Sequence, residues 1–166
     1  MRKIVFLLFI FIVIILVICS KEKYLIPDNA IRIRIIANSD DINDQKVKSE
    51  VKNKVNEFLY EKFQGIKTYK DADKVVKDNI REIDRIVSEI SNDFNISYGQ
   101  NYFPSKEYKG MTYKEGNYNS LIIKLGRGEG LNFWCVLFPP LCLIDEENMD
   151  NITYTLYVKK LLKNIK

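Results

Sequence analysis

The chain has 166 residues but no histidine, only three cysteines, four prolines and one tryptophan. Without imidazole it has neither the Ser-His-Asp and Cys-His combinations that activate a nucleophile nor a histidine ligand for zinc. Three cysteines fall short of a four-thiolate zinc site. Ser105 and Ser120 are candidate nucleophiles, yet neither has a sequence neighbour suited to act as its base. We therefore predict no catalytic, metal-binding or cofactor-binding residues.

A strong charge of either sign is also missing. Lys plus Arg amount to 26 and Asp plus Glu to 22, which gives a net charge of +4. Nucleic-acid-binding domains usually concentrate a larger basic excess on one face. We therefore expect no nucleic acid among the partners of this protein.

Charged residues are absent from an unbroken apolar run that extends from Ile4 to Cys19 and follows two cations. As a helix this run would be about 24 Å long at ~1.5 Å per residue. That length lies between a signal-peptide core and a membrane span. Residues 1–20 are therefore predicted to be a signal peptide or a signal anchor in the membrane, with a lipoprotein-type cysteine as a third alternative. The preceding cations place the rest of the chain outside the cytoplasmic membrane.

Residues 21–29 are predicted to be a linker and residues 30–166 a single exported domain. The segment 31–37 alternates Ile and Arg at its start, which predicts a strand with one wet face. Apolar residues at helical spacing then predict two amphipathic helices. One ends before Gly65, and the other runs to Ile90 behind a capping motif that begins at Thr68.

The second half of the chain alternates at period two, as strands do. The predicted strands are residues 96–102, 107–113, 118–125, 132–138 and 152–158, with a short basic helix at the end. The order of elements predicts an α+β fold. It would have an N-terminal membrane or signal helix, then two amphipathic helices packed on a mostly antiparallel sheet.

Two short motifs resemble ligand-binding loops. The acidic residues of Asn38-Ser39-Asp40-Asp41-x-x-Asp44 could hold a divalent cation, but the EF-hand pattern is absent. Helix N-capping is the interpretation we favour. Residues 126–130, Gly-Arg-Gly-Glu-Gly, lack the Gly-Lys-Ser/Thr of a phosphate loop. We predict that this stretch is a flexible hairpin connection.

The rarest residues are concentrated just after that stretch. Cys135 and Cys142 could form a disulfide across a turn, or both could be small buried apolar residues. Trp134 and Phe138 could lie in the core or anchor a partner, because aromatic side chains suit both places. Pro139 follows an aromatic residue, so a cis bond is open to it.

These residues also resemble a known family. Residues 31–51, with IIANSD at 35–40, are similar to the first block of the stage II sporulation protein R family. The run GxGxGxNxWCVLFPPLC over residues 126–142 resembles its signature in order and spacing. The likeness covers about residues 30–145. Arg34 and Phe133 depart from the family pattern, where a His and a second Trp are usual.

The resemblance implies a protein made in the forespore and exported into the intermembrane space facing the mother cell. There it would activate a membrane-embedded aspartic protease that removes the pro-sequence of sigma factor E. The alternatives are an exported cell-wall hydrolase or protease, and a structural envelope protein. Our candidate partner contacts are Trp134, Phe138, Pro139 and Pro140, with Asn38, Ser39 and Asp40 as a second surface.

Overall fold

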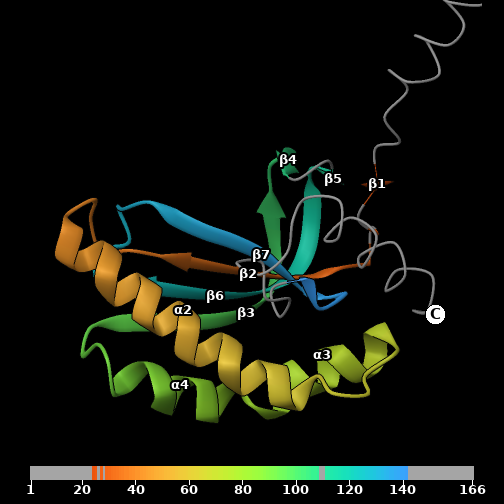
Figure 1. Ribbon diagram of the computed structural model, residues 1–166, viewed down its shortest axis with the longest axis horizontal. Helices are drawn as coiled ribbons and strands as arrows, with labels where there is room; N and C mark the ends of the chain where they lie inside the picture. The colour runs from red at the N-terminus through yellow and green to blue at the C-terminus, as the bar shows by residue number, and fades with distance from the viewer. Residues whose placement is uncertain (1–23, 26, 28, 109–110, 142–166) are drawn as a thin grey trace, which may run out of the picture.

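The computed structural model describes residues 24–25, 27, 29–108 and 111–141 (Figure 1). The apolar run of residues 4–19, the segment 142–166 and the elements predicted within them lie outside these residues. Among the helices that are described, none is long and apolar enough to cross a membrane. In chain order the elements are β1 (Tyr24–Leu25), β2 (Ile31–Ile36), α2 (Ile42–Lys62), α3 (Tyr69–Asp78), α4 (Ile80–Ser88), β3 (Phe94–Phe103), β4 (Lys106–Tyr108), β5 (Met111–Tyr113), β6 (Gly116–Leu125) and β7 (Asn132–Phe138).

The fold is α+β, as predicted, and its main sheet has four strands in the order β3-β6-β2-β7. β3 pairs with β6 and β2 with β7 in antiparallel fashion, whereas β2 and β6 are parallel. The sheet is therefore mixed, where a mostly antiparallel one was predicted. The parallel pair arises because the chain travels through all three helices and β3 before it returns alongside β2.

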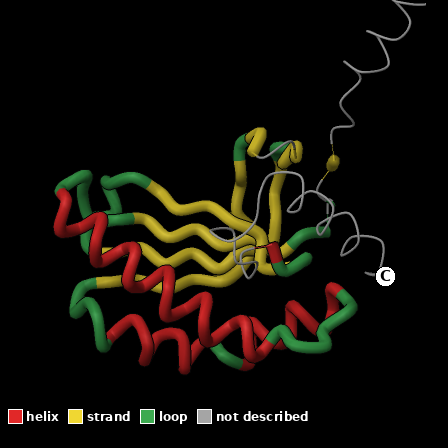
Figure 2. Tube along the Cα trace, viewed as in Figure 1, coloured by secondary structure: helices red, strands yellow, loops and turns green. Residues whose placement is uncertain are grey.

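The helices α2, α3 and α4 lie on one side of the four-stranded sheet (Figure 2). Alternation along β2 turns Ile31, Ile33 and Ile35 toward them, and all three are buried in one core cluster. Each such side chain contributes roughly 1.5–3 kcal/mol when it leaves water. The helices supply the other half of this core with Val51, Val55, Leu59, Ala72, Val76, Ile83 and Val87.

The second predicted helix is two helices, which corrects the expected number from two to three. Thr68 caps α3 as predicted, since its hydroxyl accepts a hydrogen bond from the N–H of Asp71 at 3.2 Å. The break lies at Asn79, whose backbone leaves the helical region at φ −107 and ψ 8. The Asn79 amide also donates to the carbonyl of Val75 at 2.8 Å. Such local side-chain bonds compete with the helix, and periodicity alone does not reveal them.

β3 and β6 form one long hairpin, with continuous register from Phe94↔Leu125 to Phe103↔Gly116. Beyond that end the chain forms β4 and β5, which pair with each other, and β1 joins them in a second sheet of three strands. The predicted strand 107–113 is therefore two strands. The chain reverses between them, because β4 and β5 are antiparallel. Gly110, a residue type common in turns, was the sequence signal for this reversal.

Candidate functional site

The two surfaces predicted to meet a partner reach opposite ends of β2: Phe138 pairs with Ile31 at its start, and residues 38–40 follow its end. Residues 126–130 do not form the predicted hairpin connection, because β2 lies between β6 and β7. They instead cross the C-terminal end of β2, where the chain continues into residues 37–40. We call residues 37–40 and 126–131 together the glycine clasp.

Backbone hydrogen bonds hold the glycine clasp together. The N–H of Glu129 donates to the carbonyl of Asn38 at 3.1 Å, and that of Gly130 donates to Ala37 at 3.0 Å. Side chains add to these bonds. The Asn38 side-chain oxygen accepts from the Arg127 N–H at 3.0 Å, and Asp40 accepts from the Leu131 N–H at 2.7 Å. Asn38 and Asp40 therefore have a structural role at this end of the sheet.

The glycines of the clasp are required by close approach. At Gly130, an added Cβ would collide with the backbone of Ser39. At Gly126, where φ is +52, it would collide with the side chain of Asn38. At Gly130 a larger residue would force the two segments apart, and at Gly126, where the backbone conformation favours glycine, it would displace the Asn38 side chain. These glycines therefore fit close packing within the clasp.

The acidic residues next to the clasp cap helix α2. Asp41 is the N-cap and accepts from the N–H of Asn43 at 2.8 Å, as the capping interpretation predicted. Asp44 accepts from the Ser39 hydroxyl at 2.6 Å and from the Asn38 amide at 2.8 Å. These bonds, that of Ser39 foremost, lower the pKa of Asp44. In the described part of the chain no group of His, Cys, Asp or Glu could hold a metal ion.

The face of the sheet away from the helices carries a layer of arginines and aromatic rings that the sequence interpretation missed. Arg32 was predicted to face water, yet it is only 3% exposed. Its guanidinium carbon lies 3.6 Å from the ring centroid of Tyr118 and 5.1 Å from that of Phe103. One nitrogen donates to the carbonyl of Lys114 at 3.0 Å, while the buried Nε has no hydrogen-bond partner.

Arg34, two residues along the same face, is held in a similar way. Its guanidinium carbon lies 4.4 Å from the ring centroid of Trp134. Its Nε donates to the side-chain oxygen of Asn132 at 2.9 Å. Trp134 also meets Phe103 edge-on at 5.1 Å. Trp134 is half-buried and so remains a candidate contact. The alternation of Ile and Arg in β2 was the signal that could have placed both arginines together.

The other predicted contacts near the end of β7 are less exposed. Phe138 is 2% exposed and belongs to the core cluster, which removes its side chain from the candidate surface. Its bond to Pro139 is cis, the isomer that the sequence left open. Pro139 is buried and Pro140 half-buried. Cys135 is disulfide-bonded, but Cys142 lies outside the described residues, so their pairing stays a prediction.

The densest group of titratable side chains joins α3 to the sheet. Asp73 accepts from the Tyr98 hydroxyl at 2.8 Å through one oxygen and from Lys77 at 2.6 Å through the other. Burial and the bond to Asp73 raise the pKa of Tyr98. Asn119 donates to the Tyr69 hydroxyl at 2.6 Å and to Asp73 at 3.3 Å. Both carboxylate oxygens are occupied, so this group pins a helix and presents no free base.

Neither candidate nucleophile of the sequence has a base beside it in the described residues. Ser120 is fully buried, accepts from the Asn101 amide at 2.9 Å and donates to the carbonyl of Gly99 at 3.4 Å. Ser105 is exposed between β3 and β4. Acyl transfer requires a nucleophile in contact with a base, and neither serine has such a contact among the described residues.

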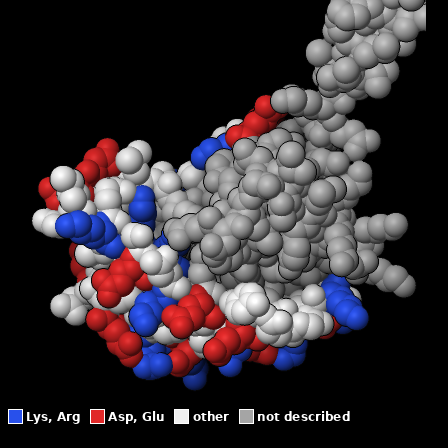
Figure 3. Space-filling view, viewed as in Figure 1, with Lys and Arg blue, Asp and Glu red and all other residues white. Residues whose placement is uncertain are grey.

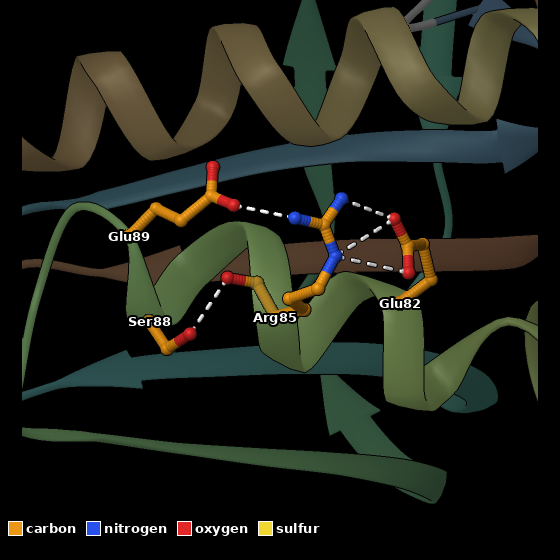
Figure 4. Close-up of polar contacts among 4 residues, drawn as sticks. All are labelled: Glu82, Arg85, Ser88 and Glu89. Atoms are coloured by element: carbon orange, nitrogen blue, oxygen red, sulfur yellow. Dashed lines mark hydrogen bonds and ion pairs between the residues drawn. The ribbon is translucent and has the colours of Figure 1, made fainter.

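The helical surface mixes both signs of charge (Figure 3). On α4 the guanidinium of Arg85 lies between Glu82 and Glu89, at 2.6 Å and 2.5 Å (Figure 4). Exposed pairs of this kind contribute little to stability. Such a surface is typical of a solvated helix and differs from the uniformly basic face of a nucleic-acid-binding domain.

Comparison with known proteins identifies the family. A family model described as stage II sporulation protein R matches residues 27–148. The chain belongs to the stage II sporulation protein R family. It is 36% identical over 135 residues to stage II sporulation protein R of Bacillus subtilis (strain 168), which covers 78% of this chain and 60% of that relative. The chain thus spans less than two thirds of the relative's length. No solved structure matches.

Family membership confirms the resemblance, and the fold explains why its two sequence blocks occur together. Residues 37–40 of the first block and the glycine run 126–130 are far apart in the chain, yet they meet in the glycine clasp. In this member of the stage II sporulation protein R family, much of that signature is therefore accounted for by packing of the chain against itself.

Proposed function

We propose that this member of the stage II sporulation protein R family is an exported, non-enzymatic activator of a membrane-embedded aspartic protease. In this role it leaves the forespore and acts in the intermembrane space, either secreted or held by its N-terminal segment. The protease then removes the pro-sequence of sigma factor E in the mother cell. The catalytic aspartates belong to the protease.

Membership of the sporulation family is the observation that carries this proposal. The side-chain chemistry of the described residues supports it. Asp73, which accepts from the Tyr98 hydroxyl, has both oxygens occupied, and Ser120 is buried and accepts from the Asn101 amide. An activator needs no catalytic group, but it must bind the active state of its partner more tightly than the inactive state.

The test is cleavage of the pro-sigma substrate in cells that express the protease with or without the full chain. We expect cleavage only when both proteins are present, and none when a catalytic aspartate of the protease is replaced. A Ser120→Ala variant should support cleavage as the parent does. Cleavage that persists without protease activity, or that is lost in a folded Ser120→Ala variant, would favour the enzyme alternative.

A further inference from the structure

The face of the four-stranded sheet opposite the helices has a one-sided charge. The register places five residues each of β3 and β6 and three each of β2 and β7 on this outer face. They are Asn95, Ser97, Gly99, Asn101, Phe103, Gly116, Tyr118, Ser120, Ile122, Lys124, Arg32, Arg34, Ile36, Asn132, Trp134 and Val136. Three are cations, and within these strands none is an aspartate or glutamate.

The helical side differs, because several of its cations lie beside carboxylates. Lys74 pairs with Asp78, Lys77 with Asp73, and Arg85 with two glutamates. Buried or half-buried charges are normally paired. On the outer face the two arginines instead rest on aromatic rings and on neutral oxygens of Lys114 and Asn132. Their positive charge is thus held in place without a counter-charge from these strands.

Arg34 is the more accessible of the two and is preorganised. The guanidinium of Arg34 packs on the indole ring of Trp134, and its Nε donates a hydrogen bond to the side-chain oxygen of Asn132. Within the described residues its two terminal nitrogens have no hydrogen-bond acceptor, and the side chain is half-buried. A guanidinium fixed in this way can receive a carboxylate with little further loss of side-chain entropy.

The outer face is open along β3. A Cβ added to Gly99 on the outer face would meet no atom within 4 Å, and Asn95, Ser97 and Lys124 on the same face are exposed. Among the aromatic residues of this face, Phe103 and Tyr118 are buried and Trp134 is half-buried. Trp and Arg are enriched at the energetic centres of protein interfaces. The face therefore combines one accessible aromatic side chain, that of Trp134, with positive charge that has no carboxylate beside it in these strands.

We propose that the outer face of the sheet is a docking surface for a partner segment with aspartate or glutamate side chains, and that Arg34 receives one of these carboxylates. Under the proposed function, on which this identification of the partner rests, the segment belongs to the protease that the protein activates. Arg32 adds positive potential from beneath, and Trp134 supplies apolar contact area.

The first test compares two charge reversals in the full chain. Arg34→Glu should weaken co-purification with the membrane protease by about 30-fold or more, as loss of an interface anchor does. Arg127→Glu makes the same charge change on the exposed part of the glycine clasp and should change it by less than about twofold. Circular dichroism checks the folding of each variant. If Arg34→Glu misfolds, Arg34→Gln replaces it. Unchanged binding of a folded Arg34 variant overturns the inference.

The second test does not depend on protease activation. A photoreactive phenylalanine analogue at Ile122 reports what lies over the outer face in sporulating cells, and the same analogue at Glu50 on α2 is the control. We expect a crosslink from position 122 to a carboxylate-containing segment of another protein, and its loss with Arg34→Glu. Crosslinks to the chain's own acidic run at residues 145–150, to a second copy, or to a segment without carboxylates would overturn the inference.

Together the two tests distinguish failure of the docking-surface proposal from failure of the proposed function. If the parent chain activates the protease but Arg34→Glu and Arg34→Gln do so equally well, the docking surface is wrong and the proposed function stands. If the parent chain fails to activate the protease, the proposed function is wrong. A crosslink to an acidic segment of a different protein that Arg34→Glu abolishes would then still support the surface.

Discussion

The guanidinium carbon of Arg32 lies 3.6 Å from the ring centroid of Tyr118, and both side chains donate to the carbonyl oxygen of Lys114. This contact joins β2 to the segment between β5 and β6, where the long hairpin leaves the main sheet. Burial lowers the pKa of Arg32, and a guanidinium stays charged in proteins.

Arg32 should therefore stabilise the fold through packing as much as through charge. Arg32→Ala removes a cation–π contact worth ~2 kcal/mol when desolvated and a hydrogen bond of similar size. The cost of burying the charge offsets part of this. We expect the free energy of unfolding to fall by about 2–3 kcal/mol in urea titrations. Arg32→Met keeps most of the volume and should lie closer to the parent. Equal losses in both variants would show that the charge itself is required.

Gly130 and Gly99 form a matched pair for testing the glycine clasp. Gly130→Ala places a Cβ against the backbone of Ser39, which cannot move without opening the clasp. We expect a loss of about 1–3 kcal/mol in the free energy of unfolding. Gly99→Ala meets open space and should leave stability unchanged or raise it by up to ~1 kcal/mol. Thermal unfolding of both variants measures the difference. Equal effects would contradict the assigned role of the clasp.

Asp44 should make the clasp sensitive to acid. Its folded-state pKa is lowered, chiefly by the hydrogen bond from Ser39 and then by that from Asn38. A depressed carboxyl pKa contributes stability that is fully present above the unfolded-state value of about 4 and is lost as pH falls through the folded value. The midpoint temperature should therefore drop less steeply below pH 4 in Asp44→Asn than in the parent. Asp84→Asn, an exposed carboxylate on α4, is the control and should follow the parent curve.

The disulfide of Cys135 has two possible partners in the sequence, Cys19 and Cys142. We predict Cys142, which would close a small ring worth roughly 2–3 kcal/mol. Cys142→Ser and Cys135→Ser should then lower the free energy of unfolding to the same extent, and the double variant should lower it no further. Cys19→Ser should have no effect. Mass spectrometry of non-reduced peptides identifies the bonded pair directly, and a peptide that joins Cys19 to Cys135 would disprove the predicted pairing.

Local patterns in the sequence determined most of the elements and the side of each that faces the core. Alternation placed Ile31, Ile33 and Ile35 on one face of β2, and Thr68 marked the start of α3. These features depend on residues within a few positions of one another, so they can be predicted without knowing the fold. The motif at residues 126–142 likewise identified the family.

The tertiary structure decided which strands are neighbours, and with that the setting of the candidate surfaces. Residues 126–130 were expected to turn a hairpin, but β2 lies between β6 and β7. The hydrogen-bond partners of Arg127 and Leu131 are instead 89 and 91 residues away in the sequence. Burial of Arg32 likewise depends on Tyr118 and Lys114, which the long hairpin carries to β2. Such contacts join chain segments that are distant in sequence. Which segments pair depends on how the whole core is buried, so the pairing cannot be predicted from a local sequence pattern.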